Sequence, residues 1–145
     1  VQIYLVIRLK KDVKEWMKIG LCDGVVLMGG KNRQELKKLL TRCHCLVHPS
    51  RQESFGNILI EAMACKCLTI GGQDSGAVPY VLKHGELGLL CDINNANSIA
   101  DAMMSAYKGN YCDMIEMAYN EVHANYSLDK ICQDYLNYFL ELSGN

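Results

Sequence analysis

The sequence predicts an α/β fold built around a parallel sheet with helices on both faces. Short apolar runs rich in branched residues recur along the chain, and segments with helical spacing of apolar residues separate them. Strands and helices that alternate in this way are typical of right-handed crossover units, which pack helices against both faces of a parallel sheet. With 145 residues, 50% of them hydrophobic, the chain has the size of one compact domain, predicted over residues 1–145.

Strands are predicted where short runs are continuously apolar: residues 1–7, 24–28, 45–48, 67–70 and 87–92. Helices are predicted where apolar residues recur three and four positions apart or where a helix start is marked: residues 32–43, 56–64 and 79–84. Pro49 ends the third strand, and Pro79 fits the first turn of a short helix. The elements therefore follow one another as strand and helix in turn.

From Asn95 onward the chain is predicted to be mostly helical. Ile99, Ala102, Met103 and Ala106 form one apolar stripe, and a second one follows at Ile115, Ala118, Tyr119 and Val122. Ser127 is predicted to cap a last helix, because its hydroxyl can accept from the first free amides. The stripe of that helix is expected to dock onto the body of the protein: Leu128, Ile131, Cys132, Tyr135 and Phe139.

Two glutamates flank the start of the helix predicted over residues 56–64. Glu53 falls in the preceding loop, and Glu61 lies eight positions later, inside the helix. Residues 54–57 between them provide backbone N–H groups at a place where a helix start leaves donors unpaired and carries partial positive charge. An anion site flanked by carboxylates that bind hydroxyl groups suits a nucleotide sugar. The alternative is that both glutamates are solvated surface acids.

Three candidate motifs follow predicted strands. They contain Gly30 and Lys31, then His48 to Ser50, then Gly71 to Gly76. The carboxyl ends of parallel strands form one rim of such a sheet, where ligands usually bind, and glycine allows a backbone to approach a ligand closely. The alternative for each glycine taken singly is that it ends a strand and turns the chain.

Composition excludes several classes of function. Fifteen basic and sixteen acidic residues give a formal net charge of −1, which disfavours nucleic-acid binding. No apolar run approaches the roughly 20 residues that span a bilayer, and no signal sequence is recognisable at the start. We expect a cytoplasmic location, with the inner face of the membrane as the alternative for a full-length protein. The chain begins with Val1 and is expected to be part of a longer protein.

The eight cysteines are predicted to be free structural thiols, because most lie in apolar runs where cysteine behaves as a small hydrophobe. Cys43, His44, Cys45 and His48 are the candidates for a metal site. On a strand, neighbouring side chains point to opposite faces, so these four cannot converge on one ion. No metal site and no tightly bound cofactor are predicted.

The stretch from Gly24 to Phe139 resembles the C-terminal half of GT-B glycosyltransferases, particularly the large retaining group called family 4. The centre of the resemblance is the E-x(7)-E signature, here Glu53 and Glu61, within the longer pattern PS-x-x-E-S-F-G-x-x-x-x-E-A-M-A. The resemblance implies a Rossmann-like parallel sheet with a helical C-terminal segment. It also implies transfer of a sugar, such as that of a UDP-sugar, with the anomeric configuration retained, as in polysaccharide biosynthesis.

The resemblance also implies roles for individual residues. Glu53 would lie beside the donor sugar and bind its hydroxyls, and Glu61 would accept hydrogen bonds from the ribose. A role for Glu53 as covalent nucleophile is the alternative. The diphosphate and sugar would meet backbone amides in the stretch from Ser54 to Ile58: Ser54, Phe55, Gly56, Asn57 and Ile58. Gly30 and Lys31 match the turn that holds the nucleobase edge in the family.

The chain departs from the family pattern in two places. An Arg and a Lys that neutralise the diphosphate belong upstream of residue 1, and Arg8, Lys10 and Lys11 do not take their place. Tyr80 stands where the family has a glutamate. The resemblance also implies an N-terminal domain that binds a glycan or lipid-linked acceptor, which we expect in a longer protein, so the fragment alone is expected to be inactive. The alternative function is a non-catalytic nucleotide-sugar-binding or assembly module of the same fold.

Overall fold

The computed structural model describes residues 3–6 and 25–144 of the chain. These residues divide into two compact units, Val1–Lys38 and Leu39–Asn145. The ends of the first predicted strand, the first residue of the second, and Cys22 lie outside the described residues. The expectation of a single domain over residues 1–145 stays a prediction.

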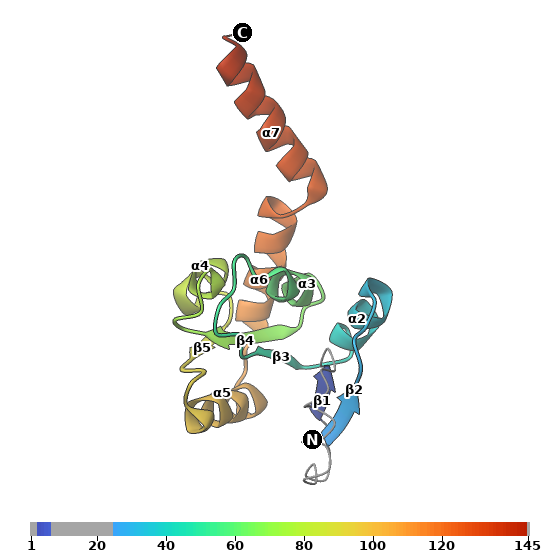
Figure 1. Ribbon diagram of the computed structural model, residues 1–145, viewed down its shortest axis with the longest axis vertical. Helices are drawn as coiled ribbons and strands as arrows, with labels where there is room; N and C mark the ends of the chain where they lie inside the picture. Colours follow the sequence, from blue (N-terminus) through green and yellow to red (C-terminus); the bar gives the residue numbers. More distant parts are fainter. Residues whose placement is uncertain (1–2, 7–24, 145) are drawn as a thin grey trace. The chain divides into compact units, whose positions relative to one another are not determined.

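The first unit contains two parallel strands, β1 (Ile3–Val6) and β2 (Val25–Met28), drawn in blue in Figure 1. Helix α2 (Arg33–Leu40) follows, and its last two residues belong to the second unit. The Glu35 N–H donates to Asn32 Oδ1 at 2.9 Å, and the Asn32 N–H donates to Glu35 Oε2 at 3.0 Å. This reciprocal capping box satisfies two free amides and explains why the helix begins after Asn32.

The second unit contains a three-stranded parallel sheet in the order β3 (Cys45–His48), β4 (Leu68–Gly72), β5 (Leu89–Cys91). Every residue of the central strand β4 is buried, as expected for a parallel strand covered on both faces. Cys45 lies opposite Leu68, and His48 lies opposite Gly71. This register brings the carboxyl ends of β3 and β4 together.

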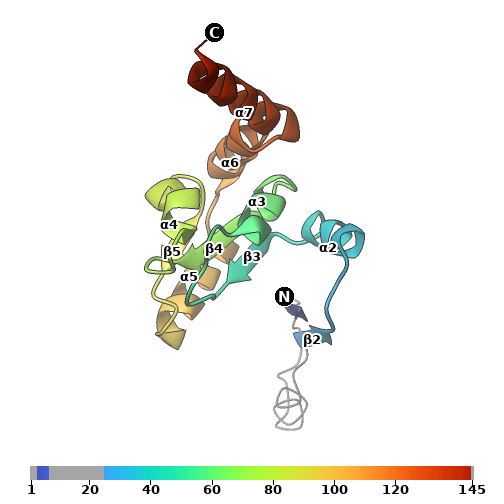
Figure 2. The same ribbon diagram turned by 45° about the horizontal axis from the view of Figure 1, so that its top comes forward.

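Helices cover both faces of this sheet, which confirms the predicted α/β class. Helices α3 (Asn57–Met63) and α4 (Val78–Val81) lie on one face, and α5 (Ala96–Lys108) lies on the other (Figures 1 and 2). Helix α6 (Cys112–Asn125) packs against α3. The main core cluster joins side chains of these helices to those of the neighbouring turns: Leu59, Met63, Val78, Val81, Leu82, Leu87, Ala118 and Val122.

The helix predicted over residues 79–84 is broken in two. Helix α4 is followed by the 3-10 turn η2 (Lys83–Gly85), in which Lys83 and His84 have φ values of 45° and 54°. This left-handed conformation reverses the chain toward β5 and is unfavourable for residues with a Cβ. The apolar pattern alone does not reveal such a reversal.

The last helix, α7 (Leu128–Ser143), begins at its predicted cap, because Ser127 Oγ accepts a hydrogen bond from the Lys130 N–H at 3.3 Å. The prediction that its apolar stripe docks onto the body is wrong. No residue of α7 is buried, and Leu128, Tyr135 and Phe139 are 75%, 63% and 61% exposed. Figures 1 and 2 show α7 extending from α6 away from the sheet of its unit.

All cysteines of the described residues are free thiols. Burial, followed by the charge of neighbouring thiols, raises the pKa of Cys45 and Cys67 to about 12. Both groups therefore stay protonated near neutral pH and behave as packing residues. Cys112 and Cys132 are also free thiols, but both lie exposed on helices α6 and α7.

Candidate functional site

Glu53 and the residues next to it follow the carboxyl end of β3, and Glu61 lies farther along the chain on α3. After His48, the chain leaves the sheet through the loop that carries Glu53 and then enters α3, on which Glu61 lies (Figure 1). Glu61 is in the middle of α3 and is half-buried. The order of loop acid and helix acid is therefore the one predicted from the sequence.

Glu53 is paired with a histidine that sequence reasoning did not include among the site residues. His48 Nε2 lies 3.0 Å from Glu53 Oε2, and the two side chains are 24% and 25% exposed. The hydrogen bond and then the charge of His48 hold the pKa of Glu53 below its ordinary value, and the amides of Gly56 and Ser54 act in the same direction. Glu53 is therefore an ionised hydrogen-bond acceptor near neutral pH.

The main chain of Glu53 is held from a different loop. Its carbonyl oxygen accepts a hydrogen bond from the Ala77 N–H at 2.9 Å. The neighbouring Gly76 has φ +60°, and a Cβ built on it would lie 2.4 Å from the same carbonyl oxygen. Only a residue without a Cβ allows the two loops to approach so closely.

The start of helix α3 is shaped by Gly56, which occupies the N-cap position with φ 90° and ψ 43°. No side chain caps this helix start, while Ser54, Phe55 and Asn57 around it are exposed. The ring of Phe55 packs edge-to-face against that of Tyr126, with the ring centroids 6.0 Å apart and an interplanar angle of 61°. This contact fixes the loop next to Glu53 against the end of helix α6.

Gly30 and Lys31 belong to the first unit, where they lie exposed between β2 and α2. A Cβ at Gly30 would meet no atom within 4 Å. The packing of the described residues around Gly30 therefore does not require a glycine at this position.

The sequence already placed His48 at the rim where ligands usually bind, since it ends a predicted strand five positions before Glu53. The spacing of the two residues does not predict that the His48 imidazole points toward the Glu53 carboxylate. The contact of Gly76 and Ala77 with Glu53 could not be predicted from the neighbouring sequence, because it joins loops that follow two different strands.

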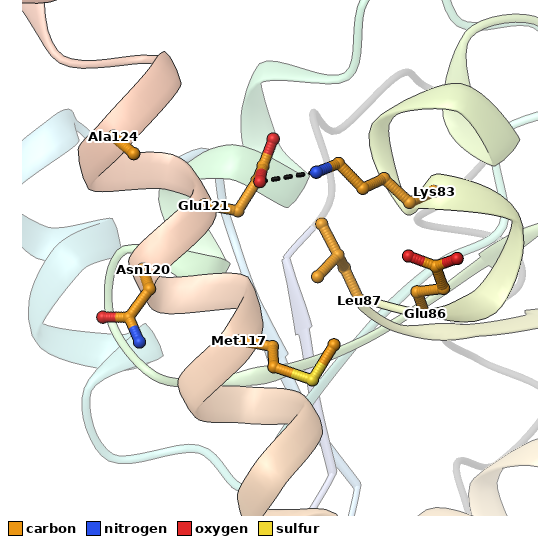
Figure 3. Close-up of a pocket in the computed structure, with 7 residues that line it drawn as sticks. All are labelled: Lys83, Glu86, Leu87, Met117, Asn120, Glu121 and Ala124. Carbon is orange, nitrogen blue, oxygen red and sulfur yellow. Dashed lines mark hydrogen bonds and ion pairs between the residues drawn. The ribbon is translucent and has the colours of Figure 1, made fainter.

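A pocket of about 350 Å³ lies elsewhere, between η2 and α6 (Figure 3). Lys83 Nζ and Glu121 Oε2 pair across it at 2.6 Å, and this hydrogen bond raises the pKa of Lys83. The pocket is lined by seven residues: Lys83, Glu86, Leu87, Met117, Asn120, Glu121 and Ala124. None of the predicted site residues is among them.

Within the described part of the chain, no group of three or more His, Cys, Asp or Glu side chains could hold a metal ion. In the same part, no helix has the length and apolar character needed to cross a membrane.

Comparison with known proteins gives a consistent picture. Residues 8–121 match the family described as glycosyl transferases group 1. The chain is 31% identical over 115 residues to N-acetyl-alpha-D-glucosaminyl L-malate synthase of Bacillus anthracis, covering 78% of this chain and 29% of that protein. The chain thus spans less than a third of the length of this curated relative.

Solved structures agree with the fold. Sucrose-phosphate synthase from Thermosynechococcus elongatus matches with a TM-score of 0.83 at 22% identity, over 99% of this chain and 39% of that one. Anabaena HepE, solved in complex with UDP and glucose, matches with a TM-score of 0.81 at 18% identity, over 97% of this chain and 40% of that one. Together with the family match over most of its length, these likenesses mean that the chain belongs to the glycosyl transferases group 1 family and has the fold of GT-B glycosyltransferases.

Proposed function

We propose that this chain is the donor-binding domain of a retaining glycosyltransferase. The whole enzyme would transfer a sugar from a nucleoside-diphosphate sugar to a glycan or lipid-linked acceptor. The observation that carries the proposal is the pair Glu53 and Glu61 within the family match, with Glu53 bound to His48 in the loop after β3. An ionised carboxylate accepts hydrogen bonds from two sugar hydroxyls at once.

In this proposal, Glu53 positions the donor sugar and Glu61 binds the ribose hydroxyls. Backbone amides at the start of α3 would meet the diphosphate and sugar: those of Ser54, Phe55, Gly56, Asn57 and Ile58. The amides of Ser54 and Gly56 also interact with the Glu53 carboxylate. Gly30 and Lys31 would hold the nucleobase edge. The nucleotide complex of HepE, a protein of the same fold, supports a UDP-sugar as the donor class.

The acceptor would be bound by a further domain of a longer protein, which the length of the relatives supports. Transfer needs the acceptor hydroxyl held against the anomeric carbon and cations that stabilise the leaving diphosphate. We therefore expect this chain by itself to bind the donor without transferring the sugar. A cytoplasmic location of the whole enzyme, with the inner membrane face as the alternative, is part of the proposal.

A thermal-shift panel of UDP, GDP, ADP and their common sugars tests this function. Ligand at 100 times its Kd stabilises the folded state by about 2.7 kcal/mol, so one base should raise the Tm selectively. Glu61→Ala should lower the nucleotide affinity about 10- to 100-fold, because hydrogen bonds to a charged group contribute about 1.5–3 kcal/mol.

Glu86→Ala is the matched control, since Glu86 is an exposed glutamate away from the predicted site. The proposal fails if Glu61→Ala and Glu86→Ala change the nucleotide affinity equally.

The second candidate is a non-catalytic nucleotide-sugar-binding or assembly module. It is favoured by Tyr80, which replaces the family glutamate and is 73% exposed on α4. Transfer by the longer protein to a supplied acceptor, measured as UDP release, decides between the two. Donor binding without any release in the presence of glycan and lipid-linked acceptors would favour the module.

A further inference from the structure

We propose that Glu53 is held for donor-sugar binding by two anchors, and that His48 and Gly76 are positioning residues of this site. His48 would orient the carboxylate, while Gly76 and Ala77 would fix the main chain of the same residue. The inference rests on the proposed function, because it concerns the sugar-binding role of Glu53. It adds two residues that would act on the sugar only through Glu53.

The first anchor acts on the side chain. Glu53 lies in a loop, where a glutamate side chain loses rotamer freedom when it is ordered. His48 ends strand β3 and lies opposite Gly71 of the buried strand β4, so its backbone is fixed by the sheet. Its Nε2 is 3.0 Å from Glu53 Oε2. The imidazole can therefore select one orientation of the carboxylate before any ligand binds.

The contact with His48 leaves acceptor capacity for a ligand. A carboxylate offers about four lone-pair sites; the His48 nitrogen meets one on Oε2, and the backbone amides of Ser54 and Gly56 also interact with the group. The Glu53 side chain is 25% exposed. The arrangement thus orders the group and keeps it accessible to a sugar hydroxyl.

The second anchor acts on the main chain. The Ala77 N–H donates to the Glu53 carbonyl oxygen at 2.9 Å, and Gly76 leaves only enough room for its own hydrogen beside that oxygen. A Cβ at 2.4 Å from a backbone oxygen cannot be accommodated unless one of the two loops shifts. A shift of this kind would move Glu53 relative to the donor sugar.

The side-chain anchor is tested with His48→Ala and His48→Gln, because the Gln amide can donate from nearly the position of Nε2. His44→Ala is the matched control, since His44 is exposed just before the other end of β3. The Glu53 carboxyl is titrated by carbon-13 NMR in each variant of this chain. Affinities for UDP and UDP-glucose are measured by calorimetry on the same samples.

We expect His48→Ala to raise the pKa of Glu53 toward its ordinary value, and His48→Gln to restore part of the lowering. We expect affinity for UDP-glucose to fall about tenfold in His48→Ala, equivalent to about 1.4 kcal/mol, with UDP affinity unchanged. The inference is overturned if the Glu53 titration is the same in His48→Ala and His44→Ala, whatever the ligands do. If the original chain binds none of UDP, GDP, ADP and their common sugars, the proposed function fails, while the titration of Glu53 still tests the contact with His48.

The main-chain anchor is tested with Gly76→Ala and a matched glycine. Gly85 also has a positive φ, +104°, but a Cβ there would meet no atom within 4 Å. Both variants therefore carry the cost of a left-handed alanine, and only Gly76→Ala adds the contact with Glu53. We expect UDP-glucose affinity to fall about tenfold in Gly76→Ala alone, with UDP affinity unchanged. Equal affinities in the two variants would overturn this part of the inference.

Discussion

At the scale of single residues, the side chains that carry the proposed chemistry depend on their immediate neighbours for their properties. Glu53 is an ordinary loop glutamate in the sequence, and in the structure the hydrogen bond from His48 orients its carboxylate and lowers its pKa. Gly56 and Gly76 adopt positive φ values on either side of it, at positions where other residues would be strained. The local backbone and one histidine thus make Glu53 different from a solvated acid.

The lowered pKa of Glu53 predicts a pH dependence of stability. Because the pKa in the folded state lies below that in the unfolded state, the folded chain binds fewer protons around the ordinary value of 4.5. The stabilisation is therefore present above pH 4.5 and is lost as the pH falls through the lower, folded-state value. Urea denaturation should find Glu53→Gln less stable than the original chain at neutral pH, with the difference disappearing in acid.

Glu86→Gln serves as the control for this experiment, because its carboxylate is exposed and lies outside the site. A stability difference for Glu53→Gln that persists unchanged below the folded-state pKa would contradict the role of ionisation.

At the scale of elements, the central strand β4 is positioned by close packing against the turn that follows it. Its sequence, LTIGG, ends in two buried glycines, and a Cβ at Gly71 would lie 2.4 Å from Val78 Cγ1. Val78 is completely buried in the core cluster and cannot move away freely. Glycine at position 71 is therefore a packing requirement between β4 and α4, at a position inside the strand.

We predict that Gly71→Ala lowers the free energy of unfolding by about 1–3 kcal/mol, the usual cost of overpacking. Val78→Ala removes the atom that the new Cβ would meet, so the double variant should lose less than the sum of the two single variants. Urea denaturation of all four proteins measures this coupling. Additive losses would mean that the two positions do not compete for the same space.

At the scale of the whole molecule, the buried core of the second unit and the exposed apolar side chains of α7 belong to different elements. The core cluster of the second unit is formed without any residue of α7, and none of the side chains of that helix is buried. Leu59, by contrast, is completely buried in the core. Exposed apolar groups contribute little to folding, because they are not removed from water.

We therefore predict that removing residues 128–145 lowers the free energy of unfolding less than Leu59→Ala does. The core substitution should cost about 2–5 kcal/mol through lost burial and a new cavity. Tyr126 stays in the truncated chain, so its contact with Phe55 is kept. An equal or larger loss on truncation, measured by urea denaturation, would show that α7 stabilises the fold of this chain.

The sequence by itself determined the features that depend on residues close to one another along the chain. Apolar runs and helical spacing predicted the parallel strands and the order of elements, and Ser127 predicted its helix start, because these signals act within one or two turns. The spacing of Glu53 and Glu61 likewise placed one carboxylate in a loop and the other on α3.

Only the tertiary structure decided which distant groups meet. The ends of β3 and β4 lie side by side in the sheet. The imidazole of His48 therefore contacts the Glu53 carboxylate, and the carbonyl oxygen of Glu53 packs against Gly76. The exposure of α7 also could not be predicted, because an amphipathic stripe indicates which face of a helix is apolar and does not indicate what covers it. Contacts between separate elements depend on strand register and packing, and neither is encoded in a local pattern.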